Sequence, residues 1–165
     1  MDIRLFDLNK DFDIIKNWIT DERTHMLWCA NRIQYPMNKA TFTDFLKEIS
    51  DKFGDAPYVA VDDTDKAVGF YAYSVNTNTK EGMLKFVIVD PDKRGKGIAG
   101  EMLERTVATA LADKNVQAVQ LNVFSVNEPA RKCYQKIGFV ERNVTKEAVK
   151  YGSESWDRIN MLIKC

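Results

Sequence analysis

Three strand-like runs follow one another in the middle of this chain without a helix between them. They cover Tyr58 to Val61, Ala67 to Val75 and Met83 to Val89. The breaks between them, Asp62 to Asp65 and Asn76 to Thr79, are rich in turn-forming residues. Because links this short join antiparallel neighbours, the sequence predicts an antiparallel meander.

A different pattern follows the meander, where helices alternate with strands. The expected elements are helices over Ile98 to Ala112 and Glu128 to Ile137, and strands over Ala118 to Val123, Phe139 to Asn143 and Ile159 to Ile163. A helix between two strands permits a parallel crossover, which the short turns of the meander do not. The sequence therefore predicts an α/β fold with a mixed sheet, in which the meander is followed by a βαβ crossover and helices cover both faces.

The segment before the meander is expected to add one strand and three helical pieces. These are Asp2 to Phe6, Phe12 to Ile19, Asp21 to about Ala30, and Ala40 to Phe53. Asp11 is a candidate N-cap for the first helix, and Gly54 supplies a stop signal for the last. The 165 residues contain no repeat, low-complexity segment or linker, so a single domain over residues 1–165 is expected.

The charges of the chain are balanced, with 24 basic and 24 acidic residues. A balanced chain has no global field that attracts nucleic acid or a membrane surface, so neither is expected as a partner. The N-terminus opens without an export signal, and no run is long enough to span a bilayer. Three scattered cysteines, Cys29, Cys133 and Cys165, are unlike a disulfide framework and fit a reducing compartment. A cytoplasmic location is expected.

His25 and Cys29 lie four residues apart, a spacing that would place two metal ligands on one face of a helix. No second pair with ligand spacing accompanies them, so no metal site is expected. The segment is interpreted as a helix that packs Met26, Leu27 and Trp28 into the core.

Residues Phe86 to Leu103 combine a buried strand, a glycine-containing loop and the start of a helix. The glycines of the loop are Gly95, Gly97 and Gly100. Glycines let successive backbone N–H groups turn toward one point, and a helix N-terminus favours an anion. Since Arg94 and Lys96 add positive charge, the loop is predicted to hold phosphate.

Two other interpretations of this loop stay open. Its three glycines match the G-x-G-x-x-G pattern of dinucleotide-binding folds. Against that interpretation, Asp90 to Arg94 separate the strand from the glycines, and Val116 to Gln120 lack the acidic residue that would bind a ribose. The loop is otherwise a plain glycine turn whose basic side chains are solvated.

Two motifs in the second half of the chain carry a family resemblance. Arg94 to Ala99, which reads Arg-Gly-Lys-Gly-Ile-Ala, resembles the acetyl-CoA signature Q/R-x-x-G-x-G/A of the GNAT superfamily of N-acetyltransferases, and Val89 to Pro91 fits its usual approach. Asn127 to Phe139 resembles the family's partner motif N-x-x-A-x-x-x-Y-x-x-x-G-F. The resemblance covers about Ala67 to Val140, with the two motifs at the family's separation. Within the family it is nearest to bacterial enzymes that act on ribosomal-protein alanine or on small amines.

The resemblance implies a splayed mixed sheet with acetyl-CoA as co-substrate. The pantetheine arm would enter between the strands Met83 to Val89 and Ala118 to Val123, and the glycine loop would hold the pyrophosphate. Asn127 would cap its own helix and also bond the arm. The expected cofactor-binding residues are Val87, Ile88, Val89, Arg94, Gly95, Lys96, Gly97, Ile98, Ala99, Gly100 and Asn127.

Tyr134 is the expected general acid. It lies seven residues after Asn127, about two helical turns, so the two side chains share a helix face. In the family this position donates a proton to the sulfur of CoA, whereas the alternative interpretation is a tyrosine packed in the core. A backbone N–H at the bulged end of the strand that ends at Val89, taken as that of Val89 itself, would polarise the thioester carbonyl.

The general base departs from the family pattern. Branches of the family carry a glutamate at the positions matched here by Asn122 or by Met83, and neither carboxylate is present. Glu81 shares strand parity with Met83 and is the candidate catalytic carboxylate, acting through a bridging water; the alternative interpretation is a solvated side chain. Glu22 is a second candidate, and loss of the amine proton to water is a third possibility.

A covalent route through Cys133, with His25 as its base, is disfavoured. On a helix Cys133 would point about 100° away from Tyr134 and so away from the thioester. A buried structural cysteine is expected instead, and the amine is expected to attack directly in a ternary complex.

The expected function is acetyl transfer from acetyl-CoA to a primary amine, either of a small molecule or of a peptide or protein N-terminus. The expected partners are acetyl-CoA and this acceptor, and the expected assembly is a monomer or homodimer. By the resemblance, the N-terminal region would form much of the acceptor wall, and Tyr151 to Trp156 is a second candidate wall. The aromatic residues of the first wall, most of which are also candidates for the core, are Trp18, Trp28, Tyr35 and Phe42. The alternative is a non-catalytic module that binds or senses acyl-CoA, since the cofactor motifs are complete while the base is not evident. The presence of Tyr134 favours the enzyme over the binding module, because binding of acyl-CoA without turnover does not need a phenol at this position.

Overall fold

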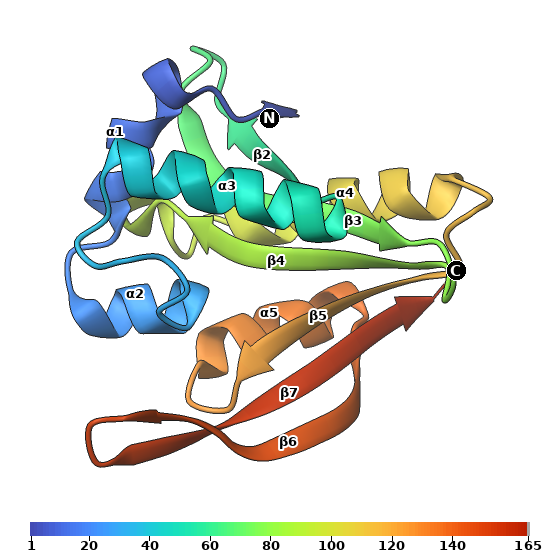
Figure 1. Cartoon of the computed structure of the whole chain (residues 1–165). Coiled ribbons are helices and arrows are strands. Elements are labelled where there is room, and N and C mark those ends of the chain that lie inside the picture. The colour runs from blue at the N-terminus through green and yellow to red at the C-terminus, as the bar shows by residue number, and fades with distance from the viewer. Residues whose placement is uncertain (165) are drawn as a thin grey trace.

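The computed structural model describes residues 1–164, and Cys165 lies outside the described residues. Within residues 1–164, seven strands form one sheet in the order β1-β2-β3-β4-β5-β7-β6 (Figure 1). The strands are β1 (Asp2–Leu5), β2 (Ala56–Val61), β3 (Ala67–Asn76), β4 (Glu81–Val89), β5 (Ala118–Phe124), β6 (Val140–Tyr151) and β7 (Glu154–Lys164). β4 and β5 run parallel, and the other neighbouring pairs are antiparallel. The expected mixed sheet, a meander followed by a crossover, is confirmed.

The helices of the described chain divide between the two faces of this sheet (Figure 1). They are α1 (Leu8–Trp18), α2 (Glu22–Cys29), α3 (Lys39–Phe53), α4 (Ile98–Ala112) and α5 (Glu128–Ile137), with a short 3₁₀ turn at Pro91–Lys93. Successive strand residues point to opposite faces. Accordingly Val59 and Phe70 pack in the core beneath α1, α2 and α3, whereas Ala60 and Tyr71 pack in the core beneath α4 and α5. None of the helices within residues 1–164 combines the length and apolar character that a membrane span requires.

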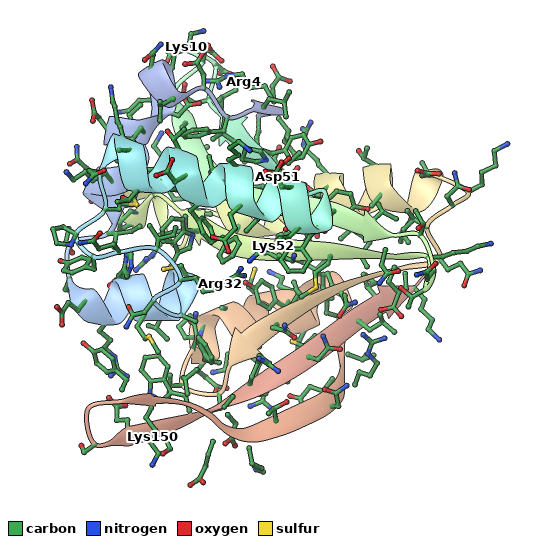
Figure 2. The ribbon with its side chains drawn as sticks, in the orientation of Figure 1. Arg4, Lys10, Arg32, Asp51, Lys52 and Lys150 are labelled. Atoms are coloured by element: carbon green, nitrogen blue, oxygen red, sulfur yellow. The ribbon has the colours of Figure 1, made fainter. Side chains whose placement is uncertain are left out.

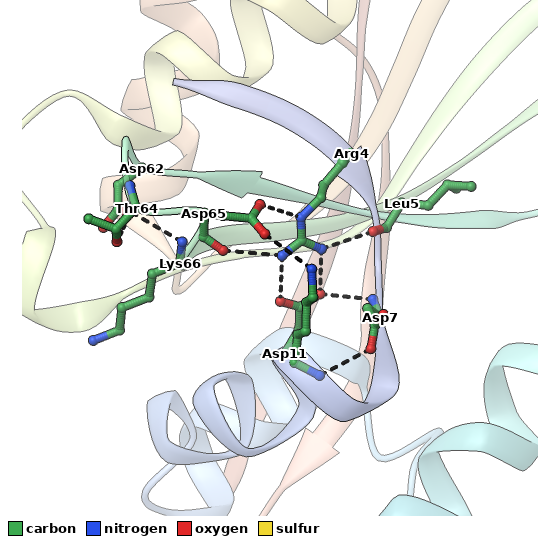
Figure 3. A network of polar contacts seen from close by, with 9 residues as sticks. Arg4, Leu5, Asp7, Asp11, Asp62, Thr64, Asp65 and Lys66 are labelled. Atoms are coloured by element: carbon green, nitrogen blue, oxygen red, sulfur yellow. Dashed lines mark hydrogen bonds and ion pairs between the residues drawn. The ribbon is translucent and has the colours of Figure 1, made fainter.

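Helix α1 begins at Leu8, four residues before the predicted start, and the prediction that Asp11 is its N-cap is wrong. Asp7 caps the helix, because its side chain accepts two backbone N–H groups of the first turn. Asp11 is instead buried, and its carboxylate accepts hydrogen bonds of 2.8 and 2.9 Å from the Arg4 guanidinium (Figure 3). Since Arg4 also donates to Asp65, this network ties β1 to α1 and to the turn between β2 and β3.

The parallel strands β4 and β5 are neighbours over only a short stretch. Glu81, Gly82 and Met83 pair with Ala118 to Gln120, and no pairing continues beyond them in the described chain. Past this point the two strands diverge toward the end of the sheet beside α2 (Figure 1). The splay implied by the family resemblance is therefore present, and it opens the sheet at the C-terminal end of β4.

Strand β4 carries a bulge at the start of the divergence. Its register with β3 slips between Lys85 and Ile88. Within this slip Phe86 adopts a left-handed φ of 54°, which is unusual for a non-glycine residue. The bulge thus lies at Phe86 and Val87, near the end of β4 as expected, and β4 pairs with β3 again at Ile88 and Val89.

Strands β6 and β7 form a long hairpin that the sequence analysis shortened. β6 continues to Tyr151 instead of ending at Asn143, and β7 starts at Glu154. Most of β6 is exposed on both of its faces, so it lacks the alternation of apolar and polar residues by which a strand is recognised. Pairing with β7 holds β6 from Val140, opposite Leu162, to Tyr151, opposite Glu154.

Candidate active site

Two adjoining cavities open where β4 and β5 diverge. The first, of about 440 Å³, is lined by the end of β4, the loop that follows it, and helices α2, α4 and α5. The second, of about 240 Å³, is lined by α2, the middle of β4, β5 and the β6–β7 hairpin. The cavities meet at the residues that line both, which are Leu27, Trp28, Val87, Asn127 and Tyr134.

The glycine loop forms one end of the first cavity. Gly95 and Gly97 adopt left-handed φ angles of 77° and 78°, and a Cβ added to either would have no atom within 4 Å. Gly97 caps α4 without a side chain, and the first helical hydrogen bond runs from the Glu101 N–H to the Gly97 carbonyl at 3.0 Å. Ile98, Ala99 and Gly100 line the cavity, and their N–H groups have no partner within the helix. This open helix N-terminus fits an anion such as a pyrophosphate.

Positive side chains accompany the glycine loop. Lys93 and Arg94 line the first cavity, whereas Lys96, which the sequence analysis also expected to bind the cofactor, is exposed and does not line it. The Lys93 ammonium lies 3.5 Å from the Asp62 carboxylate. Arg94 therefore offers a cation that is not already paired in this way.

The bulge of β4 forms the inner part of the first cavity. Val87, Ile88 and Val89 all line it. The indole N–H of Trp28 donates to the Phe86 carbonyl at 2.8 Å, which gives a partner to a backbone group that the bulge takes out of the ladder. Trp28 is buried, as expected, and it also lines both cavities, as expected of an aromatic residue in the acceptor wall. Its hydrogen bond to the bulge was not predicted from the sequence.

Helix α5 carries Asn127 and Tyr134 to the junction of the two cavities. Asn127 caps the helix, and its side chain accepts the Ala130 N–H at 3.4 Å. Tyr134 is 7% exposed and packs edge-on against the Phe139 ring. Burial raises the pKa of the Tyr134 phenol above its ordinary value, so the hydroxyl is protonated at neutral pH and available as a proton donor.

Cys133 does not occupy the buried structural position that was expected. It is half-buried and lines the first cavity beside Tyr134. Burial raises the pKa of its thiol, which disfavours the nucleophilic thiolate. The base once considered for it, His25, is buried on α2, where its Nε2 lies 2.7 Å from the Ile33 carbonyl and 3.3 Å from the Cys29 sulfur.

The structure places Glu81 away from both cavities. It lies at the first residue of β4, where β4 and β5 are still paired. Its carboxylate accepts a hydrogen bond of 3.0 Å from the Arg142 guanidinium. Met83, which has the same strand parity, does line the second cavity. The expected face of β4 is therefore correct, but Glu81 lies too far toward the start of the strand to reach the cavity. Glu22, in the first turn of α2, lines neither cavity.

Asn122, the position where related enzymes would carry a glutamate, lines the second cavity. Its side-chain oxygen accepts a hydrogen bond of 2.9 Å from the Asn160 amide. The β6–β7 hairpin contributes Val149 and Arg158 to this cavity. The expected wall from Tyr151 to Trp156 does not line it. The sequence analysis missed Arg158 because no local pattern connects this residue to a site built largely from β4 and β5.

No group of three or more His, Cys, Asp or Glu side chains that could hold a metal ion occurs within residues 1–164. His25 and Cys29 contact each other, as helical spacing requires, but no third ligand joins them. The polar groups that line the two cavities include backbone groups, basic side chains, asparagine amides and the Tyr134 phenol.

Comparison of the sequence with known protein families agrees with this fold and with these cavities. The profile of the acetyltransferase (GNAT) family matches residues 13–139, and the chain belongs to this family of acetyltransferases. Enzymes of the family use acetyl-CoA, and the residues around the first cavity fit it. The resemblance inferred from the two motifs is confirmed.

Particular relatives give the relationship more detail. The mycothiol acetyltransferase of Actinosynnema mirum is 35% identical over 95 residues, which are 57% of this chain and 31% of that protein. The chain thus matches less than a third of that relative's length. Spermidine N-acetyltransferase from Vibrio cholerae, solved in complex with CoA and spermine, superposes with a TM-score of 0.82 at 20% identity, over 99% of this chain and 94% of the other. A dodecameric form of that enzyme gives a TM-score of 0.75 at 19% identity, over 99% and 92% of the two chains. These likenesses show a shared fold.

Proposed function

We propose that this chain transfers an acetyl group from acetyl-CoA to a primary amine, by direct attack of the amine within a ternary complex. The observation that carries the proposal is the position of Tyr134 at the junction of two cavities, one of which fits CoA. A protonated phenol at this junction would lie beside both the thioester and the acceptor. The assignment of each residue's role below belongs to the proposal.

The first cavity has the donors that acetyl-CoA needs. The N–H groups from Gly95 to Gly100 would bind the pyrophosphate, with Arg94 beside them. Backbone groups of Val87 to Val89, which have no partner on β5 where the two strands diverge, would bind the pantetheine arm together with Asn127. Bound acetyl-CoA supplies an acyl group that is activated as a thioester.

Tyr134 acts as the general acid. As the bond from the amine nitrogen to the acetyl carbon forms, the bond from that carbon to sulfur breaks, and the Tyr134 hydroxyl gives its proton to the departing sulfur. The attacking nitrogen, which carries a positive charge once its bond to carbon has formed, loses one proton to water, and the phenolate recovers a proton from solvent. Because the pKa of Tyr134 is raised by burial, the group keeps its proton throughout the neutral range.

The amine gives up its own proton to water. Within residues 1–164, no Asp or Glu side chain lines either cavity, and Glu81 is held by Arg142 outside both. The neutral form of the acceptor therefore enters the site from solvent. Glu81 has no part in the proposed mechanism.

The test is Tyr134→Phe, which keeps the ring and its packing and removes the proton donor. We expect kcat to fall about a hundredfold, the usual contribution of a positioned general acid, while CoA affinity and thermal stability stay within error of the parent. Tyr58→Phe is the control, because Tyr58 stacks on Tyr71 in β2 and β3 and lines neither cavity. CoA release is followed with a thiol reagent, and CoA binding by calorimetry on the same samples.

The pH profile sharpens this test. The parent enzyme should show no alkaline loss of rate below about pH 9.5, since burial places the Tyr134 pKa above the ordinary value of about 10. Equal rates for Tyr134→Phe and the parent would remove Tyr134 from the mechanism. Tight CoA binding with no turnover of any amine would support the acyl-CoA-binding module instead.

A further inference from the structure

Among the residues that the structure describes, three basic side chains and no acidic one line the second cavity. Arg32, Lys85 and Arg158 all line it, together with neutral residues. We infer that the acceptor is a small amine that also carries an anionic group, a carboxylate or a phosphate, and that Arg158 and Arg32 bind this group. The inference rests on the proposed function in that it takes the second cavity as the acceptor site.

The three cations are not equivalent. The Lys85 ammonium lies 2.8 Å from the Asp55 carboxylate, which is fully buried, so this pair is close to neutral. Arg158 and Arg32 form no ion pair within the described chain. A cavity with two unpaired guanidinium groups attracts an anion, and Arg matches carboxylate and phosphate geometry with two parallel hydrogen bonds.

Arg32 is held in place by aromatic rings instead of by a carboxylate. Its guanidinium lies 5.4 Å from the centre of the Phe45 ring and 5.7 Å from that of Phe86. Figure 2 shows Arg32 beside α2, below β4 in that view, at the opening of the sheet. Lys52, which donates to Glu48 at 2.8 Å, and more weakly Arg32, lower the pKa of Glu48. Since Lys52 already pairs with Glu48, most of the charge on Arg32 is left for a ligand.

Asn122 adds a donor to the same wall. Its side-chain oxygen accepts from Asn160, and Asn160 in turn accepts from Arg142 through its own oxygen at 2.8 Å. This chain of bonds fixes the Asn122 amide with its oxygen occupied, which leaves its NH₂ group as the free part. The position that could have held a catalytic carboxylate therefore presents a hydrogen-bond donor, which again suits an anionic ligand.

The size and lining of the cavity restrict the acceptor further. Its volume of about 240 Å³ is suited to a molecule of amino-acid size. A linear polyamine would bring several positive charges to two unpaired arginines with no carboxylate on the lining to receive them, which is unfavourable. The expected acceptors are thus amino acids or amino phosphates.

The experiment compares amines that differ only in the anionic group, using the complete chain and acetyl-CoA. The first pair is phenylalanine and phenylalaninamide, which share the ring and the α-amine. The second set is β-alanine, O-phosphoethanolamine and ethanolamine, which separates carboxylate from phosphate recognition. Spermidine is the cationic probe. CoA release gives kcat and KM, and calorimetry on CoA-saturated protein gives the affinity for each amine.

The variants are Arg158→Gln and Arg32→Gln, alone and combined. We expect the parent to prefer at least one anionic amine over its neutral partner by at least tenfold in kcat/KM at equal pH, after correction for the fraction of neutral amine. Each substitution should lower this preference through KM, the double variant should abolish it, and CoA affinity should not change. Lys150→Gln is the matched control, because Lys150 is an exposed cation of the same hairpin that lines neither cavity (Figure 2). Because both arginines are exposed, the preference should also weaken with added salt.

The outcomes separate the inference from the proposed function. If spermidine or the neutral amines match the anionic ones, or if the preference survives the double variant, the inference is overturned. If no amine is acetylated, the proposed function fails, and calorimetry still decides whether the anionic amines bind through Arg158 and Arg32. Binding of the anionic amines that is lost in the double variant and retained in Lys150→Gln supports the inference.

Discussion

Gly97 and Gly54 form a natural matched pair for testing the phosphate loop. Both adopt the left-handed conformation, with φ of 78° and 74°, and both would place an added Cβ where no protein atom lies within 4 Å. Gly54 ends α3 and lines neither cavity, whereas Gly97 begins α4 and lines the first cavity. An alanine at either position therefore meets the same backbone cost, and it meets CoA only at Gly97.

The expected magnitudes follow from this comparison. A left-handed non-glycine residue costs roughly 1–2 kcal/mol, so Gly97→Ala and Gly54→Ala should each lower the melting temperature by a few degrees and by similar amounts. CoA affinity should fall at least tenfold, which is about 1.4 kcal/mol, in Gly97→Ala alone, because its methyl group takes the space of the pyrophosphate. The N–H groups at residues 98–100 would remain, so some binding should persist.

Thermal unfolding without ligand and calorimetric titration with CoA measure the two quantities separately. The reasoning fails if a folded Gly97→Ala variant binds CoA as tightly as Gly54→Ala does. It fails as well if the two variants lose CoA affinity together, since the loss would then follow from destabilisation and not from the occupied space.

Two further predictions concern the supporting structure and the cavity wall. Arg4→Met should lower the free energy of unfolding, measured in urea, by about 2–3 kcal/mol, because it leaves the buried Asp11 carboxylate without its guanidinium partner. The control is Lys10→Met, which removes the exposed ion pair Lys10–Asp65 and should cost less than about 1 kcal/mol. An equal loss of stability in the two variants would contradict the role of burial. Cys133 should react slowly with iodoacetamide at pH 7, since burial raises its thiol pKa, and faster as pH rises. Saturating CoA should protect Cys133, as measured by peptide mass spectrometry, and unprotected alkylation would place CoA elsewhere.

The sequence by itself determined the elements whose signals are local. The glycine loop and the start of α4 follow from residues adjacent in the chain, as do the caps at Asn127 and Gly54, because backbone conformation and helix ends depend on nearest neighbours. Polar turns between apolar strands were enough to predict the meander. Together with the two family motifs, these signals predicted most of the residues that line the first cavity, Tyr134 among them.

Only the tertiary structure showed which residues line the second cavity and that Glu81, the candidate base, lies outside it. Glu81 has the expected strand parity, but parity does not say how far along β4 the sheet opens, and that distance depends on pairing with β5. The position of the bulge depends likewise on register with β3. Arg158 reaches the site because β7 pairs beside β5, a contact between residues far apart in the sequence. Such contacts leave no local pattern, since the energy that selects them comes from packing and pairing across the whole sheet.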